Sequence, residues 1–179
     1  MTQDTNQVMT RRFSAFTLAE VLVVITIIAI AVSASVAFSA TSSTMRLNAA
    51  VQSFVADLLY AQNRAITAQG KVYVIFTPGT STSADKYELQ SPLGAVLARA
   101  DGATGTVTMG RAQTQMPGAK LGFTAALTIG FDASGQPFTR SGSADTPIIQ
   151  VRPITLSNAT GNGATTVSIQ PFSGEITIQ

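Results

Sequence analysis

Residues 16–40 read FTLAEVLVVITIIAIAVSASVAFSA, and this apolar run decides the fold. Glu20 is its only charged residue, and the run contains neither glycine nor proline. At about 1.5 Å rise per residue, a helix over residues 21–40 covers about 30 Å, which is the hydrocarbon thickness of a bilayer. The sequence therefore predicts one membrane-spanning helix in this segment.

A polar segment, residues 1–15, precedes the apolar run and carries Arg11 and Arg12. Because positive residues beside a span stay in the cytosol, we expect a cytosolic N-terminus and an extracytoplasmic chain after residue 40. Two plainer interpretations are a cleaved secretory signal peptide and a simple membrane anchor. The apolar region of a signal peptide usually has about 7–15 residues, which is shorter than this run.

The composition argues against a catalytic protein. The chain has 179 residues, enough for one ordinary domain and an appendage, with 45% hydrophobic and 11% charged residues. It has no histidine and no cysteine, so it lacks the usual near-neutral general base and any thiol nucleophile. Its nine acidic residues show neither the pairing of acid catalysis nor the spacing of a calcium loop. We expect no enzyme, no cofactor and no metal site.

The start of the apolar run resembles the class III signal of type IV prepilins. The resemblance rests on Ala15-Phe16-Thr17-Leu18-Ala19-Glu20, followed by VLVVITIIAI. It implies that a prepilin peptidase/methyltransferase cuts between Ala15 and Phe16, removes the basic leader and methylates the Phe16 amine. The family usually has glycine where Ala15 stands, and because alanine is also small we expect cleavage here.

The same resemblance implies an assembly role for Thr17, Leu18 and Glu20, in which Glu20 pairs with the Phe16 amine of a neighbouring subunit. A carboxylate buried among apolar helices needs a cation, and such a pairing would supply one. The alternative is that Glu20 is only an acidic residue at a helix N-terminus, where the macrodipole stabilises it.

Residues 45–69 continue with a helical pattern. Apolar positions recur at a spacing of three or four, which predicts an amphipathic helix with one apolar face: Leu47, Val51, Phe54, Leu58, Ala61 or Gln62, and Ala65. The polar residues Arg46, Gln52, Asp57 and Arg64 fall elsewhere on this helix, and Gly70 is the expected C-cap. Many major pilins have a helix breaker within the first half of the stem, so its absence from residues 16–40 favours a minor component.

After Gly70 the sequence changes to short alternating runs separated by turn residues. We expect strands at 71–77, 86–91, 95–99, 106–110, 119–123, 127–132, 136–141, 147–157, 165–170 and 175–179. The expected large core residues are Phe76, Phe123, Phe131, Phe138 and Phe172. The predicted fold class is α+β: a long N-terminal helical stem, transmembrane in its first half and amphipathic in its second, packed on a pilin-like head with an antiparallel sheet or sandwich.

Three later stretches resemble the GspH/FimT family of H-type minor pseudopilins and related minor pilins: residues 58–76, 129–138 and 167–179. The resemblance implies a hairpin motif at Phe131, Asp132, Gly135 and Pro137, and a closing hairpin at Gly174, Glu175 and Ile176. Residues 78–118 match nothing specific.

Acidic turn residues and net charge bear on ligands. We interpret Asp132 and Asp145 as turn residues, with calcium binding as the alternative because related pseudopilins of another type bind calcium.

Without residues 1–15 the chain keeps nine basic and eight acidic residues, a side-chain charge of +1. Since no cationic cluster remains to release counterions, we do not expect nucleic acid binding.

Both resemblances imply a structural protein of the bacterial inner membrane, single-pass with a periplasmic head. The expected parts are a leader (1–15), a transmembrane or filament-core helix (16–40), an amphipathic stem helix (41–70) and a β-rich head (71–179). The expected role is a minor pseudopilin of a type II secretion system, assembled with other pseudopilins by an inner-membrane platform. The alternatives are a minor type IV pilin for priming, adhesion or DNA uptake, and a tethered binding domain that never polymerises.

Overall fold

The computed structural model describes residues 17–80, 82–110, 114–158 and 163–179, and the side chains of all of these except 33–41. The chain divides into two units, residues 1–39 and 40–179. Helix α1 covers Leu18–Thr67. The strands of the described residues are β1 (Val72–Thr77), β2 (Asp85–Gln90), β3 (Thr106–Met109), β4 (Ala119–Leu121), β5 (Leu127–Phe131), β6 (Pro137–Ser141), β7 (Ala144–Pro147), β8 (Arg152–Asn158), β9 (Ala164–Ile169) and β10 (Ile176–Ile178).

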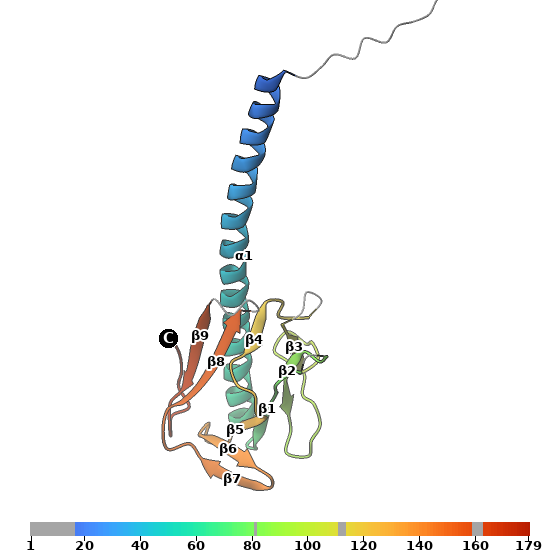
Figure 1. The fold of residues 1–179 in the computed structure, drawn as a ribbon. Coiled ribbons are helices and arrows are strands. Elements are labelled where there is room, and N and C mark those ends of the chain that lie inside the picture. The colour runs from blue at the N-terminus through green and yellow to red at the C-terminus, as the bar shows by residue number, and fades with distance from the viewer. Residues whose placement is uncertain (1–16, 81, 111–113, 159–162) are drawn as a thin grey trace, which may run out of the picture. The chain divides into compact units, whose positions relative to one another are not determined.

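The strands form two antiparallel sheets (Figure 1). The six-stranded sheet has the order β3-β2-β1-β5-β6-β7, and the four-stranded sheet has the order β10-β9-β8-β4. Neighbours in each sheet are mostly consecutive in the chain, as expected for hairpin connections. The prediction of an α+β protein with antiparallel sheets is confirmed.

One apolar cluster joins helix and sheets within residues 40–179. The predicted helical face is buried at every position from Leu47 through Ala65, and Phe54 and Leu58 are fully inaccessible to solvent. These side chains pack with buried residues of both sheets, among them Phe76, Tyr87, Phe131, Ile154 and Ile169. Each sheet and the helix therefore bury one apolar face in a common core.

The C-terminal cap of the helix lies one residue before the predicted one, Gly70. Gln69 has a φ of 49°, and its N–H donates to the Ile66 carbonyl oxygen at 3.2 Å. The N–H of Gly70 donates to the Ala65 carbonyl oxygen at 3.1 Å, which completes a Schellman motif. Gln69 is therefore the left-handed residue that ends the helix, and Gly70, the predicted cap, is the residue after it.

Two predicted strands are wrong. Residues 95–99 make only isolated bridges, because the chain turns at Gly94 and again at Gly102, where φ is 81° and 79°. The predicted strand over 147–157 begins too early, since β8 starts at Arg152 in the four-stranded sheet and Pro147 ends a different strand, β7, of the six-stranded sheet. A single straight strand cannot pair in both sheets, so residues 148–151 connect them.

The expected aromatic core is wrong at one position, Phe172. Phe76 and Phe131 are fully buried in the core, and Phe123 is half-buried against it. Phe138 is buried outside this cluster, over Gly130 and beside Tyr73. Phe172 is 62% exposed, because it occupies the turn between β9 and β10 with a φ of 62°.

Asp57 is buried, contrary to its predicted position away from the apolar face. Its carboxylate accepts hydrogen bonds from the Tyr87 hydroxyl and from Arg99 Nε, the latter at 3.0 Å. Arg99 Nη2 also donates to Ser53 Oγ at 2.9 Å. Burial, together with the Asp57 charge, raises the pKa of Tyr87, which therefore stays a neutral donor. These bonds hold the β2–β3 connection against the helix.

We predict that Arg99→Met destabilises the protein by about 3–5 kcal/mol, because it leaves the Asp57 carboxylate buried without a cation. Urea unfolding of the full chain in detergent at pH 7 measures the free energy of unfolding. Arg152→Met is the matched control, since Arg152 lies exposed at the start of β8, and it should change stability by less than about 0.5 kcal/mol. Equal stability of both variants would contradict a structural role for the Asp57–Arg99 pair.

Candidate functional site

Helix α1 begins with a polar capping arrangement. The Glu20 N–H lies 3.3 Å from Thr17 Oγ1 and 3.1 Å from the Thr17 carbonyl oxygen. Thr17 thus occupies the N-cap position, and Leu18 is the first helical residue. A threonine followed three residues later by glutamate is the sequence pattern of a capping box. The sequence forms a helix here because the cap satisfies N–H groups that a helix end leaves unpaired.

Glu20 lies in the first helical turn, where the macrodipole favours a carboxylate. Its side chain is exposed and makes no hydrogen bond or ion pair with another residue that the structure describes. The geometry is thus compatible with the N-terminal capping role and leaves the carboxylate available to a neighbouring cation. The remaining predicted motif residues, Arg11, Arg12, Ala15 and Phe16, lie outside the described residues.

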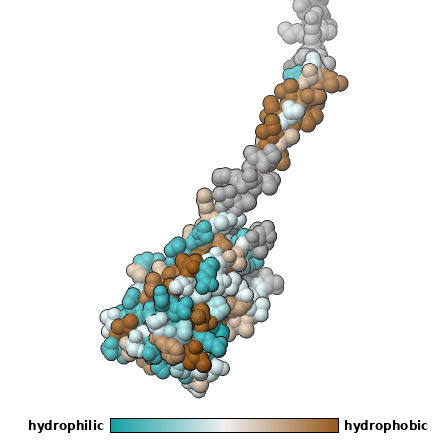
Figure 2. All heavy atoms as spheres, turned by 90° about the vertical axis from the view of Figure 1, so that its left-hand side faces the viewer, coloured by the Kyte–Doolittle hydropathy of each residue, from teal (hydrophilic) through white to brown (hydrophobic). Residues whose placement is uncertain are grey.

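The helix after Glu20 is apolar on all sides. Consecutive large side chains are exposed between residues 21 and 32, for example Ile25 at 60% and Ile30 at 70%. Thr26 satisfies its hydroxyl by donating to the Val23 carbonyl oxygen at 2.7 Å. Figure 2 shows this part of the helix in brown. A helix that is apolar all round is stable when other apolar groups cover it, so this surface is built for contact.

Over the side chains that the structure describes, no helix is both long enough and apolar enough to cross a membrane. Part of the predicted span, residues 33–40, lies outside those side chains. The membrane span therefore stays a prediction.

The first predicted hairpin motif lies between β5 and β6. Asp132 Oδ1 accepts three hydrogen bonds, from Ser134 N–H at 2.9 Å, Ser134 Oγ at 2.6 Å and Gln136 N–H at 2.9 Å. Partial burial acts to raise the pKa of Asp132, but these hydrogen bonds outweigh it and hold the pKa below its usual value. Phe131 and Pro137 pair across the hairpin, and Gly135 takes a φ of 81° in the turn.

The second predicted motif closes the turn between β9 and β10. The Gly174 N–H donates to the Gln170 carbonyl oxygen at 3.1 Å, and Gln170 N–H donates to the Glu175 carbonyl oxygen at 2.8 Å. Glu175 N–H donates to Ser173 Oγ at 3.2 Å, while the Glu175 residue itself is exposed. Gly174 and Glu175 therefore both lie in the connection between β9 and β10.

Gln62 of the stem helix brings the two turns together. Its Nε2 donates to the Gly135 carbonyl oxygen at 3.0 Å and to the Ser173 carbonyl oxygen at 3.2 Å. A Cβ on Gly174 would lie 2.5 Å from Gln62 Nε2 and 2.6 Å from the Gly135 oxygen. Sequence reasoning missed this junction, although a glutamine at a core-facing helical position was a signal that could have found it.

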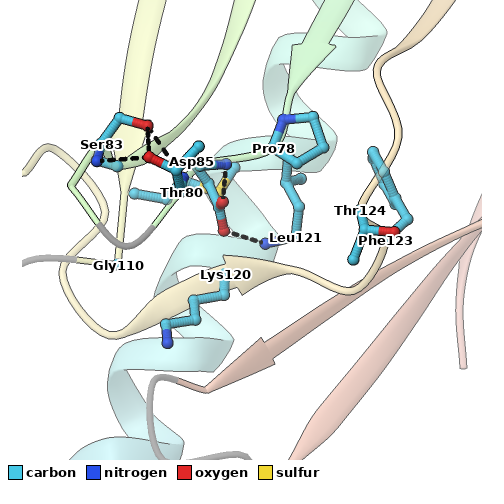
Figure 3. A pocket seen from close by; sticks show the side chains of 12 residues that line it. Pro78, Thr80, Ser83, Asp85, Gly110, Lys120, Leu121, Phe123 and Thr124 are labelled. Atoms are coloured by element: carbon cyan, nitrogen blue, oxygen red, sulfur yellow. Dashed lines mark hydrogen bonds between the residues drawn. The ribbon is translucent and has the colours of Figure 1, made fainter.

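A pocket of about 440 Å³ lies where the two sheets meet, near the β1–β2 connection and β4 (Figure 3). Asp85 Oδ1 accepts the Gly79 N–H, and its Oδ2 accepts the Leu121 N–H at 2.9 Å. The Thr80 and Ser83 hydroxyl groups lie 2.9 Å apart and bond to each other. The Asp85 carboxylate therefore joins β4 to the six-stranded sheet, which is a structural role.

Metal ligands do not gather in the described part of the chain, where no group of three acidic side chains could hold an ion. Asp145 lies in β7, where Lys71 Nζ approaches its Oδ2 to 2.7 Å. Its predicted place in a turn is therefore wrong, because Asp145 pairs with Arg140 across the β6–β7 ladder.

Comparison with known proteins supports the N-terminal motif. Residues 10–36 match the family described as the prokaryotic N-terminal methylation motif, which marks a pilin or pseudopilin. The motif implies processing by prepilin peptidase and assembly with other pilins, and it is consistent with a membrane-anchored protein. No curated protein and no solved structure matches the chain. The resemblance of the later stretches to the GspH/FimT family thus has no support from these comparisons.

We predict that Gly174→Ala costs clearly more stability than Gly142→Ala. Both glycines have left-handed backbone, with φ of 67° and 61°, but a Cβ on Gly142 meets no atom within 4 Å. Gly142→Ala should therefore cost only the backbone strain of about 1–2 kcal/mol, and Gly174→Ala should add about 1–3 kcal/mol for overlap with Gln62 and Gly135. Urea unfolding of both full-length variants measures the difference, and equal losses would rule out a tight junction.

Proposed function

We propose that this chain is a structural minor pseudopilin of a type II secretion system. The observation that carries the proposal is the N-terminal methylation motif, directly followed by a helix whose apolar side chains are exposed on every side. Prepilin peptidase removes residues 1–15, so Phe16 becomes the methylated N-terminus. The mature protein then joins other pseudopilins in the periplasmic pseudopilus that drives protein export.

The apolar helix serves two environments in turn. Before assembly, residues 16–40 anchor the protein in the inner membrane with the head in the periplasm. In the filament, the helices of neighbouring subunits replace lipid, because apolar side chains can pack against one another as well as against acyl chains. The assembly platform extracts the helix from the membrane, and the tether becomes the filament core.

Glu20 sets the axial position of each subunit in this proposal. Within the filament the carboxylate is surrounded by apolar helices, where an unpaired charge is costly. The methylated amine of Phe16 from a neighbouring subunit supplies the opposite charge. Thr17 and Leu18 place this carboxylate by starting the helix immediately before it.

The head, residues 71–179, has a packing role rather than a catalytic one. The carboxylates of Asp85 and Asp132 in the head, and that of Asp57 in the stem helix packed against it, all accept internal hydrogen bonds. The two turns held by Gln62 are those in which the GspH/FimT resemblance lies. This arrangement suits a small H-type subunit that caps or joins a filament.

A minor type IV pilin is the second candidate, because the methylation motif is shared by pilins and pseudopilins. Loss of secretion of the system's substrate protein on deletion of this gene, with pili retained, supports the first candidate. Loss of surface pili with secretion retained supports the second.

We predict that Glu20→Gln lowers incorporation into sheared filaments at least about tenfold, since losing one partner of a buried pair costs about 3–5 kcal/mol. Glutamine can still complete a capping box, so a helix-capping role alone predicts normal incorporation. Glu175→Gln is the matched control, because it removes the same charge from an exposed head residue and should leave incorporation unchanged. Immunoblots of the sheared and cell-bound fractions give the share of each variant that enters filaments. Incorporation of Glu20→Gln at the wild-type level would contradict the pairing of Glu20 with the Phe16 amine.

A further inference from the structure

The outer face of the six-stranded sheet carries aromatic rings that lie apart from the main core. The Phe138 ring covers Gly130, where an added Cβ would lie 2.2 Å from the ring. Phe138 meets Tyr73 edge to face, with ring centroids 5.5 Å apart. Arg140 Cζ lies 4.6 Å from the Tyr73 centroid, and Lys71 Nζ lies 5.3 Å from the Phe138 centroid. Two cations therefore flank two rings that meet edge to face.

Asp145 lies within ion-pair distance of both cations but accepts a hydrogen bond from only one of them, Lys71. Its Oδ2 accepts hydrogen bonds from Lys71 Nζ at 2.7 Å and from the Tyr73 hydroxyl at 3.3 Å. The hydrogen bond with Asp145 raises the pKa of Lys71, which keeps this ammonium charged. Asp145 Oδ1 lies 3.8 Å from Arg140 Nε, beyond hydrogen-bond distance. Lys71, Arg140 and Asp145 together carry one positive charge in excess.

The Arg140 guanidinium is held in place while the four N–H groups of its two Nη atoms stay without a hydrogen-bond partner among the described residues. Nε donates to the Gly142 carbonyl oxygen at 3.2 Å, and the planar group stacks on Tyr73. The guanidinium is also ion-paired with Asp145, but neither Nη atom has a hydrogen-bond partner among the residues that the structure describes. Arg99 is different, because its Nη2 already bonds Ser53 and Asp57. Arg140 therefore presents an open and pre-oriented fork.

A cleft of about 350 Å³ lies beside this fork. Tyr73, Ile75 and Thr128 of the sheet line it, together with the 91–94 turn and Gly142. The Thr128 hydroxyl has no hydrogen-bond partner within the described residues, and Ser91 Oγ accepts one bond, from Ala95 N–H. None of the described residues that line the cleft is acidic. The cleft is rich in donors and carries one cation.

We propose that this cleft binds the carboxylate of an aspartate or glutamate side chain on a short extended segment of a partner polypeptide. A guanidinium fork takes a carboxylate through two parallel hydrogen bonds. One negative charge also balances the one positive charge in excess, whereas a phosphate dianion would bring a second charge toward Asp145. The cleft is larger than a carboxylate, so it has room for the flanking backbone. This contact goes beyond the proposed function, because it gives the head a partner of its own.

The test titrates the ¹⁵N-labelled full chain in detergent micelles with the blocked peptide acetyl-Thr-Gln-Glu-Gln-Thr-amide. We expect saturable shifts of the Thr128 and Gly142 amides and of the Arg140 Nε–H. The same peptide with Gln in place of Glu should bind at least about tenfold more weakly, because a hydrogen-bonded charged group is lost. Equal binding of the two peptides overturns the proposal.

Variants separate the cleft from general charge effects. Arg140→Gln and Arg140→Lys should each weaken binding about tenfold, since lysine keeps the charge but lacks the fork. Arg152→Gln removes an equal charge from the other sheet and should leave binding unchanged. Unshifted resonances of residues remote from the cleft, in β8 and β9, show that each variant is folded. Wild-type affinity of Arg140→Gln overturns the proposal.

Two further probes identify the source of the anion. The Gln peptide with a free C-terminal carboxylate tests whether the cleft binds a chain terminus. If this peptide binds and the blocked Glu peptide does not, the assignment to an acidic side chain is overturned. Inorganic phosphate tests a general anion site. Saturation by phosphate in the absence of any response to the Glu peptide also overturns it.

Discussion

The burial of one apolar helix is the demand on which the rest of this protein depends. Residues 21–32 expose large aliphatic side chains on every side of α1, and Glu20 provides the only charge at the start of that surface. Water cannot stabilise such a helix, so lipid or other apolar helices must cover it. A methylation motif that keeps the helix attached to the mature chain is a means of using the same surface twice. In the proposed function the apolar stretch serves first as a membrane anchor and later as the packed core of a filament.

The head has a different constraint, because many short strands and turns must be held together by few charged residues. Polar side-chain hydrogen bonds add to the common apolar core where strands and turns meet the stem or one another. Asp57 binds Tyr87 and Arg99, Gln62 binds the two turns of the predicted motifs, and Asp85 connects the two sheets. Each of these contacts joins segments distant in the chain, and each leaves few unsatisfied groups. The head thereby gains a defined shape from a sequence rich in Ser, Thr, Gly and Ala.

Sequence patterns predicted those features that depend on local periodicity. The helical face from Leu47 to Ala65 and most strands were readable because their side-chain repeats follow from backbone geometry. The burial of Asp57 was not readable, since its partners lie 30 and 42 positions away. The late start of β8 and the presence of β7 in the other sheet depended on long-range pairing in the same way. Phe172 was misjudged because hydrophobicity alone does not reveal a left-handed turn position. The open fork of Arg140 also required the fold, because Tyr73 and Gly142 orient it.

The most direct test of the central claim is the intact mass and N-terminal sequence of the protein purified from membranes of its native host. We predict a mature chain that begins at Phe16 and carries one methyl group on the α-amine. A chain that still begins at Met1, or one cut near residue 35 by a secretory signal peptidase, would contradict the claim. In either of those cases the apolar helix would not be the stem of a processed pilin-like subunit.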